Sequence, residues 1–376
     1  MIDSVKNPLP SRVEIVVMGG GTAGCSAALH LAQAGRKVVL FEQRLCGGMA
    51  SGQNYGGVRQ QGRLEVELPL SFRSRELWDK MEKIVGNDCG FRRTGHLKLA
   101  RTPEQIASLE EWAVMARRHG LTVTMVTGNE LRTQHPYLSE EACGASFCPT
   151  DGSANPRVTA PQWARAAEKA GADVREYCPV RALEREGGGF RVTLADGRST
   201  CCDVLVNTAG AWGAGLAAQL GESYPEGTLH PNMNVSEPMA PVISANFGVC
   251  GGDIYFRQTG RGNIIFGGGR GVGDRDRLWS RPLAEVNLRQ ARAMLRLVPG
   301  LAGINLIRSW SGIDGMMPDE SPVFGASPTV PGLFHAFGFS GHGFQLGPGA
   351  GAVLCDLVIR GETPTDISGL LPKRFL

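Results

Sequence analysis

A short apolar run that stops at a cluster of glycines and continues into a helical stretch is the feature that most constrains this chain. Residues 13–18, VEIVVM, are followed by GGGTAG and then by a helix-forming stretch to residue 34. Gly19, Gly21 and Gly24 match the pattern G-x-G-x-x-G. In that pattern the first glycine permits a tight turn, the second lets the backbone approach a pyrophosphate, and the third lets helix and strand pack closely. The order therefore predicts a Rossmann-like unit that binds a dinucleotide at the helix N-terminus.

A second apolar run and an acidic residue follow this motif. Residues 37–41, KVVLF, are typical of a buried strand, and the run ends at Glu42, 18 residues after Gly24. A carboxylate at this point accepts hydrogen bonds from ribose hydroxyls and would repel the 2′-phosphate of NADP. The spacing therefore favours FAD or NAD, and it does not choose between them.

The overall composition narrows the kinds of partner. The chain has 376 residues, enough for about two or three domains. Lys and Arg number 39 against 36 Asp and Glu, so the formal net charge is +3 and the basic excess of a nucleic-acid or anionic-lipid binder is absent. The 52 glycines follow no collagen period. We therefore expect them to serve turns and close approaches of the backbone to a small ligand.

The cysteines and the hydropathy pattern bear on the compartment. The ten cysteines include no Cys-x-x-Cys pair and no zinc-ligand spacing, so we expect reduced thiols, no metal site and no iron–sulfur centre. No window approaches 18 uninterrupted apolar residues, and the first twelve residues lack a secretory signal pattern. These features predict a cytoplasmic protein without a membrane span.

Composition and predicted secondary structure change along the chain, and the changes indicate two interleaved domains. Charged helical stretches such as 103–119 dominate 64–149, and strand-like runs between glycine turns fill 225–320. A glycine-rich crossover after residue 332 returns to the character of the first unit. We predict an α/β chain with a Rossmann-like cofactor domain and a discontinuous α+β substrate domain with a mixed sheet. The cofactor domain is expected to comprise 12–63, 150–222 and 323–376, and the substrate domain 64–149 and 223–322.

The loop after the nucleotide motif is a candidate part of the site. Residues 46–63, CGGMASGQNYGGVRQQGR, are too rich in glycine for regular structure and carry Arg59 and Arg63. Loops hold many binding residues and also many that only face solvent. The loop therefore lines the cofactor or forms a solvated connection, and composition leaves both interpretations open.

Three stretches carry a resemblance to a known family. VVMGGGTAGCSAALHLAQAGRKVVLFE, DVLVNTAGAW and GFSGHGFQLGPGAGAVLCDLV occur in the order and at the separations found in the FAD-dependent D-amino acid oxidase superfamily. The stretch SWSGIDGMMPDESPVFG resembles the sarcosine oxidase and glycine oxidase branch. GGVRQQGR and SGHGFQ are most similar to the FAD-carrying β subunits of heteromeric amine dehydrogenases. These include opine oxidases, D-hydroxyproline and proline dehydrogenases, and heterotetrameric sarcosine oxidase.

The resemblance implies FAD as the cofactor and implies which residues line it. They belong to the glycine turn, to the segment after the acid at the end of the second strand, and to two later strand ends. They also belong to the C-terminal crossover, where amides at a helix N-terminus suit negative charge at flavin N1 and O2. The set is Gly19, Gly21, Thr22, Ala23, Gly24, Glu42, Gln43, Gly48, Met49, Ala50, Ser51, Val180, Thr208, Ala209, Gly210, Trp212, Gly341, His342, Gly343, Phe344 and Gln345.

Four departures limit what carries over from the relatives. Monomeric sarcosine oxidases have a carboxylate-binding lysine at the place of Gln345 and a flavin-linking cysteine in the stretch of Gly312. Glycine oxidases place a carboxylate-binding arginine where this chain has Asp314. The histidine that carries FMN in heterotetrameric sarcosine oxidase corresponds to Pro156. The resemblance therefore implies non-covalent FAD, a different carboxylate anchor, and any FMN at a subunit interface held without a covalent bond.

The implied reaction is oxidation of an α-amino acid, in which the Cα hydride passes to the flavin and the resulting imine hydrolyses. Arg59 is the candidate anchor for the carboxylate because a planar guanidinium suits bidentate pairing. Alternatively, Arg59 is held by the flavin or by an internal acid. His342 acts as a general base or, the interpretation we favour, only forms a hydrogen bond near the ring. The catalytic candidates are Arg59, His342, Gln345, Tyr255 and Asp314, with Arg63, Arg257 and Tyr255 as weaker candidates for the carboxylate.

The resemblance also implies partners. A β subunit without an iron–sulfur or quinone site needs other chains to carry its electrons onward, so we expect a larger α subunit and a small ferredoxin-like subunit. The expected substrate is a secondary amino acid of the opine or D-hydroxyproline/proline type. Two alternatives stay open: an autonomous FAD oxidase of D-amino acids, glycine or sarcosine that releases hydrogen peroxide, and a flavoprotein with a mainly structural or regulatory role.

Overall fold

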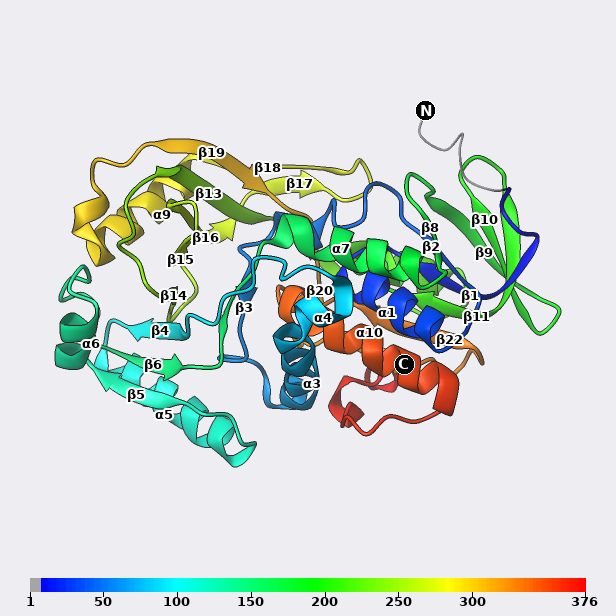
Figure 1. Cartoon of the computed structure of the whole chain (residues 1–376), viewed down its shortest axis with the longest axis horizontal. Coiled ribbons are helices and arrows are strands. Elements are labelled where there is room, and N and C mark those ends of the chain that lie inside the picture. Colours follow the sequence, from blue (N-terminus) through cyan, green and yellow to red (C-terminus); the bar gives the residue numbers. More distant parts are fainter. Residues whose placement is uncertain (1–7) are drawn as a thin grey trace.

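The computed structural model describes residues 8–376, and two mixed eight-stranded sheets organise them (Figure 1). At the centre of the first sheet, β1 (Arg12–Met18) lies between β2 (Val38–Phe41) and β11 (Ser199–Asn207), parallel to both. The order continues through β22 to β21 on one side and to β8 on the other, and the β9–β10 hairpin pairs with β11. These strands span β8 Asp173–Arg175, β9 Val180–Glu186, β10 Gly189–Leu194, β21 Val323–Ala326 and β22 Leu333–Phe337.

The apolar run in β1 is continuous because both faces of this sheet are covered. Ile15 and Val17 face a core formed with helices, whereas Val16 and Met18 face a second core formed with the β9–β10 hairpin. Parallel strands buried on both faces have this composition. The covering helices are α1 (Thr22–Gln33), α7 (Pro156–Lys169) and α10 (Gly343–Arg360), with α3 (Leu68–Asp79) packed on α10.

The second sheet has the order β19-β13-β16-β15-β14-β4-β6-β5, and only the β14–β4 pair is parallel among its described strands. Helix α9 (Ala284–Leu297) packs on β16 and β13, and the stacked rings of Phe247 and Phe256 lie in the core between. The strands span β4 His96–Ala100, β5 Thr124–Thr127, β6 Gly144–Cys148, β13 Pro231–Pro238, β14 Asn246–Val249, β15 Tyr255–Gln258, β16 Asn263–Arg270 and β19 Leu306–Ser311.

Shorter elements connect and extend the two sheets. Three two-stranded sheets pair β3 with β7, β12 with β20 and β17 with β18. These strands span β3 Gly57–Val58, β7 Gly152–Ser153, β12 Gly227–Leu229, β20 Asp314–Met316, β17 Val272–Asp274 and β18 Trp279–Arg281. The remaining α-helices are α2 Ala50–Gln53, α4 Met81–Val85, α5 Pro103–Arg118, α6 Gly128–Gln134 and α8 Gly213–Ala218.

The predicted α/β fold with a Rossmann-like unit and a mixed second sheet is confirmed. The strands of the first sheet come from the segments assigned to the cofactor domain, but α3 belongs to the 64–149 segment and packs on α10. The domain boundaries themselves stay a prediction. Between residues 8 and 376, no helix combines the length and hydropathy that a membrane span requires.

Close packing of α1 on α10 depends on a glycine. A Cβ at Gly351 would lie 2.4 Å from the backbone nitrogen of Ala27, and Ser26 Oγ donates a hydrogen bond to the Pro348 carbonyl at 2.8 Å in the same contact. Gly351→Val should therefore lower the free energy of unfolding by about 1–3 kcal/mol through overpacking. Denaturant unfolding tests this, with Gly300→Val as the control because a Cβ at Gly300 meets no atom within 4 Å. Equal midpoints for the two variants would contradict the prediction.

Candidate active site

A cavity of about 1110 Å³ is lined by residues of both sheets. Its wall begins at the glycine turn after β1, passes the 47–63 loop and the N-terminal turn of α10, and ends against β4, β14 and β15 of the second sheet. One end is therefore built by the Rossmann-like unit and the other by the second sheet.

The nucleotide end is shaped by the glycine turn and by Glu42. Gly19 has φ +104°, and a Cβ there would lie 2.5 Å from the Thr208 carbonyl oxygen. Glu42 Oε2 accepts a hydrogen bond from the Gly20 amide at 2.6 Å and Oε1 accepts one from the Arg44 amide at 2.8 Å. Burial raises the pKa of this carboxyl, and the amide bonds oppose the shift. The glycine turn and the acid are therefore held together at one rim of the cavity.

Two observations at this end fit the pyrophosphate of FAD. The N-cap residue of α1, Gly21, has no side chain to cap the helix, and the first turn of α1 lines the cavity. The Thr22 hydroxyl is buried and has no hydrogen-bond partner, while the Thr22 amide donates to Ser51 Oγ at 3.0 Å. An unsatisfied hydroxyl and a free helix N-terminus are favourable for an anionic group. The residues present therefore fit this cofactor.

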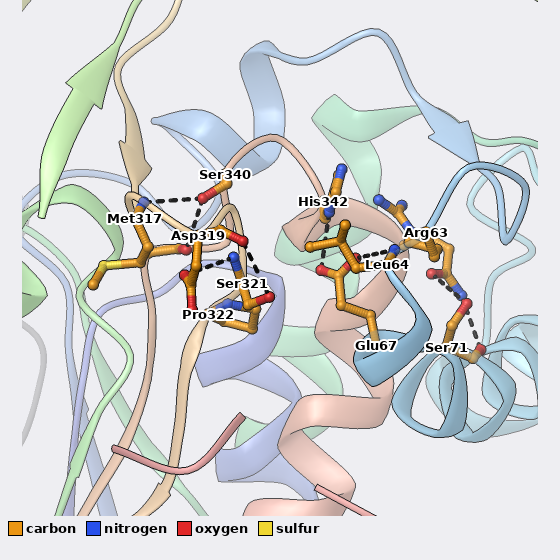
Figure 2. Close-up of polar contacts among 12 residues, drawn as sticks. Arg63, Leu64, Glu67, Ser71, Met317, Asp319, Ser321, Pro322, Ser340 and His342 are labelled. Carbon is orange, nitrogen blue, oxygen red and sulfur yellow. Dashed lines mark hydrogen bonds and ion pairs between the residues drawn. The ribbon is translucent and has the colours of Figure 1, made fainter. Parts of the chain in front are cut away.

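The opposite end of the cofactor path is built by the turn before α10. Figure 2 shows His342 facing Glu67, and His342 Nδ1 lies 2.9 Å from Glu67 Oε1. Burial, followed by the charge of Arg63, lowers the pKa of His342 to about 4, so the imidazole is neutral at neutral pH. A neutral ring bonded to a carboxylate through Nδ1 carries its proton there. Nε2 is then an acceptor, and it forms no hydrogen bond within residues 8–376.

Asp314 and Met317, which precedes the Pro-Asp-Glu-x-Pro turn, form hydrogen bonds with the loop of residues 338–342 before α10. Backbone amides of Gly341 and Gly315 bond to the Asp314 carboxyl, and burial raises its pKa to about 6. Ser340 Oγ accepts a hydrogen bond from the Met317 amide at 3.0 Å (Figure 2). Asp319 accepts from the Ser321 amide at 3.1 Å, which stabilises the turn. The acids at 314 and 319 therefore support the loop on which His342 lies.

The two arginines of the loop after the nucleotide motif both line the cavity. Arg59 donates to the Gln61 carbonyl, and it forms no ion pair with a described residue. Arg63 is only 2% exposed, and its Nε and Nη1 have no hydrogen-bond partner. Burial lowers the pKa of both guanidinium groups, that of Arg63 to about 9. The charges of Asp151 and Glu67 act on both arginines, but neither acid forms an ion pair with them in the described part of the chain. Two desolvated cations without a direct ion pair favour an anionic ligand at this point.

Other candidates are engaged elsewhere in the fold. Arg257 does not line the cavity, since Nε donates to the Tyr55 carbonyl at 2.9 Å and Nη2 to Ala154 at 3.3 Å. The Gln345 amide lines the cavity, but Oε1 and Nε2 each bond to Ser71 at 3.0 Å. These contacts favour positioning roles for both residues.

Tyr255 lies on the substrate side of the cavity. Its hydroxyl donates to Met233 Sδ at 3.3 Å, and its ring packs edge-on against Tyr55 with centroids 5.0 Å apart. Burial raises the pKa of Tyr255 to about 12, so the phenol stays protonated. The two rings form an aromatic wall across from the arginines.

The structure brings the predicted residues together at one cavity. All of the proposed cofactor and catalytic residues line it except Gly24, whose Cβ position lies 1.9 Å from the Gly19 carbonyl oxygen and which serves the turn itself. Sequence reasoning missed the buried acid Glu67 and two basic residues of β4, His96 and Lys98. His96 and Lys98 alternate with leucines in the run HLKLA, a pattern that indicates a strand with one polar face. Which way that face points depends on the pairing of the second sheet, so the sequence did not place these two residues at the cavity.

Comparison with known proteins agrees with this geometry. Residues 14–357 match the family described as FAD dependent oxidoreductase, DAO. The chain belongs to this family. The predicted FAD-dependent enzyme is thereby confirmed, whereas the absence of a covalent flavin bond at Gly312 stays a prediction. Among the described residues that line the cavity the one cysteine is Cys178, whose amide bonds to the Glu42 carbonyl at the nucleotide end.

Individual relatives of this FAD-dependent oxidoreductase differ in length. A glycine oxidase from Geobacillus kaustophilus is 29% identical over 365 residues, covering 95% of this chain and 96% of the relative. The mitochondrial sarcosine dehydrogenase of Homo sapiens is 27% identical over 394 residues, and the chain spans 42% of that protein. The crystal structure of L-proline dehydrogenase from P. horikoshii superposes with a TM-score of 0.89 at 27% identity, covering 98% of each chain.

The glycine turn supplies a direct test of the cofactor site. A Cβ at Gly21 would lie 3.1 Å from Ser51 Oγ, in the path of the pyrophosphate. We predict that Gly21→Val abolishes FAD binding, measured as flavin released per chain after denaturation. Gly303→Val is the control, since a Cβ at Gly303 meets nothing within 4 Å. Full flavin occupancy in Gly21→Val would show that the cofactor lies elsewhere.

The lowered pKa of His342 predicts a flat contribution to the pH profile. The ring is charged only below about pH 4, so its protonation state does not change between about pH 6 and 9. His342→Asn keeps a donor for Glu67 and should lower the flavin reduction rate far less than the roughly 10²–10⁴-fold loss expected for a general base. Stopped-flow reduction across this pH range tests it. Disappearance of an inflection in the variant would instead make His342 the base.

Proposed function

We propose that this FAD-dependent oxidoreductase oxidises a secondary α-amino acid, of the opine or D-hydroxyproline/proline type, to the imine. The observation that carries the proposal is the placement of the half-buried Arg59 and the buried Arg63, which both line the cavity and form no ion pair within residues 8–376. The names of three relatives support the same chemistry, since these proteins are a glycine oxidase, a sarcosine dehydrogenase and an L-proline dehydrogenase. The neutral His342 and the aromatic wall formed by Tyr55 and Tyr255 suit the uncharged form of an amine.

The residues divide the work in a simple way. Arg59 binds the substrate carboxylate, and the tyrosine pair excludes water from the α-carbon. When bound, FAD accepts the hydride, two electrons and one proton, from that carbon. The remaining amine proton leaves to solvent. Water then hydrolyses an opine-type imine to a keto acid and an amine, whereas it opens a proline-type cyclic imine to a single amino keto acid. With FAD bound, the amides at the start of α10, which no side chain of the described residues caps, would stabilise negative charge on the reduced cofactor.

We place the chain as the catalytic β subunit of a heteromeric dehydrogenase, with a larger α subunit and a small ferredoxin-like subunit as electron acceptors. A second cavity, of about 910 Å³, supports an additional anionic group such as FMN at a subunit interface, because its wall includes Arg44, Arg157, Arg165 and Arg308. Pro156 begins α7 directly beside Arg157 and leaves no histidine there for a covalent bond. The alternative is an autonomous oxidase that forms hydrogen peroxide, which the similarity to glycine oxidase over nearly its whole length favours.

Substitution of the carboxylate anchor tests the proposal. Arg59→Lys keeps the charge and removes bidentate pairing, so the substrate should lose about 1.5–3 kcal/mol of binding free energy. KM for the amino acid should therefore rise roughly 10–150-fold, with FAD content unchanged. Arg289→Lys, on the exposed face of α9, is the matched control. An unchanged KM in Arg59→Lys would move the anchor to Arg63.

The choice of electron acceptor separates the two functional candidates. With the purified chain and a reducing substrate, we expect rapid turnover with an artificial dye and slow peroxide release in air. The reason is that the reduced flavin of a dehydrogenase subunit passes its electrons to a partner subunit, which the dye replaces here, faster than to oxygen. Peroxide release as fast as dye reduction would support the autonomous oxidase and exclude the need for partners.

A further inference from the structure

The cavity continues beyond Arg59 to a second basic group on β4. His96 and Lys98 lie on the same face of this strand and line the cavity, whereas Leu97 and Leu99 face the core of the second sheet. A Cβ at Gly62 would lie 3.2 Å from Arg59 Nη1 and 3.3 Å from Lys98 Nζ, so both cationic groups border the same glycine. His96 Nδ1 bonds to Gln61, which fixes the ring beside them.

The basic groups are arranged in order along the cavity. Arg63 lies beside the His342–Glu67 pair at the start of α10 (Figure 2), and its charge acts on both residues. Arg59 affects both Arg63 and Lys98, whereas Arg63 is not among the charges that act on Lys98. The sequence from the cofactor outward is therefore Arg63, Arg59, Lys98.

Lys98 has no acidic partner in the described part of the chain. Burial, followed by repulsion from Arg59, lowers the pKa of its ammonium group, and no carboxylate of the described residues is among the groups that oppose this shift. Asp253 lines the same wall, but its carboxylate is paired with Arg101 at 2.7 Å. Asp151 accepts the Gln60 and Gln61 amides and acts on Arg59, not on Lys98. A half-buried ammonium without a counter-charge is costly unless the ligand supplies one.

We propose that Lys98 binds a second carboxylate of the substrate, so that this site takes a secondary amine with a carboxylate on each arm. Arg59 holds the carboxylate next to the carbon that is oxidised, and Lys98, with His96 beside it, holds the carboxylate of the N-substituent. Gly248 is the register partner of Lys98 on the adjacent strand β14, and it lines the cavity together with Gly251 and Gly252. None of these three residues has a side chain that would fill the space beside Lys98, which leaves room for that arm. This inference rests on the proposed function and chooses between the two substrate types named there, because only the opine type has a second carboxylate.

A matched substrate series tests the second carboxylate. N-alkylglycines and N-(carboxyalkyl)glycines of equal chain length differ only in that group, so anaerobic flavin reduction compares them directly. We expect half-saturation at tenfold or more lower concentration for the dicarboxylic member at the chain length that reaches Lys98. Lys98→Gln should remove this preference by weakening the dicarboxylic member far more than the N-alkylglycine. Lys98→Arg should retain the preference, and the exposed Lys80→Gln should have no effect. The flavin content of each variant reports folding.

A binding measurement keeps this inference separable from the proposed function. Shifts of the flavin absorbance on titration with glutarate and with butyrate report binding without turnover. Tighter binding of glutarate, lost in Lys98→Gln, supports the second subsite even if no amine reduces the flavin, an outcome that would contradict only the proposed function. Equal affinities for the two acids, or an equal loss for both substrates in Lys98→Gln, would overturn the second subsite while oxidation of N-alkylglycines could still stand.

Discussion

The contact between the N-terminal turn of α10 and α3 positions the arginine loop, residues 59–63, at the cavity. The Gln345 side chain forms two hydrogen bonds with Ser71, and the Gln345 backbone carbonyl accepts one from the Trp78 indole N–H at 3.0 Å. One turn earlier, His342 forms a hydrogen bond with Glu67. These bonds are buried, where an unmade partner is costly. They fix the arginine loop, which directly precedes α3, against the turn that faces the flavin ring. The relation between cofactor and substrate subsites therefore depends on this one helix pair.

The electrostatic character of the cavity changes from one end to the other. The nucleotide end offers free amides and the Thr22 hydroxyl, the middle holds the neutral His342 with its carboxylate partner, and the far end is basic. Burial lowers the pKa of Arg59 and Lys98, which means that the fold places these cations in a poorly solvated site before any ligand arrives. An anionic substrate offsets that cost, so selectivity for carboxylates follows from desolvation as well as from hydrogen bonding.

The sequence predicted the parts of the site that depend on local order. The glycine turn, Glu42 and the α10 crossover each lie within one strand, turn or helix, so spacing was sufficient to identify them. Arg59 was found through the resemblance, because nothing local distinguishes it from a solvated loop arginine. Lys98 and Glu67 were missed, since their cavity-facing positions arise from strand pairing and from the α3–α10 contact. Whether Arg257 reaches the cavity depended in the same way on the tertiary positions of Tyr55 and Ala154.

The central claim is that one continuous cavity holds FAD and a carboxylated secondary amine in reacting contact. Anaerobic titration of the FAD-loaded chain with a panel of such amines tests it most directly, because the flavin absorbance reports electron transfer inside this chain alone. The account predicts complete bleaching of one flavin per chain by at least one member of the panel, with the matching keto acid as product. A chain that binds FAD fully and is bleached by none of them, at concentrations that saturate binding, would contradict it.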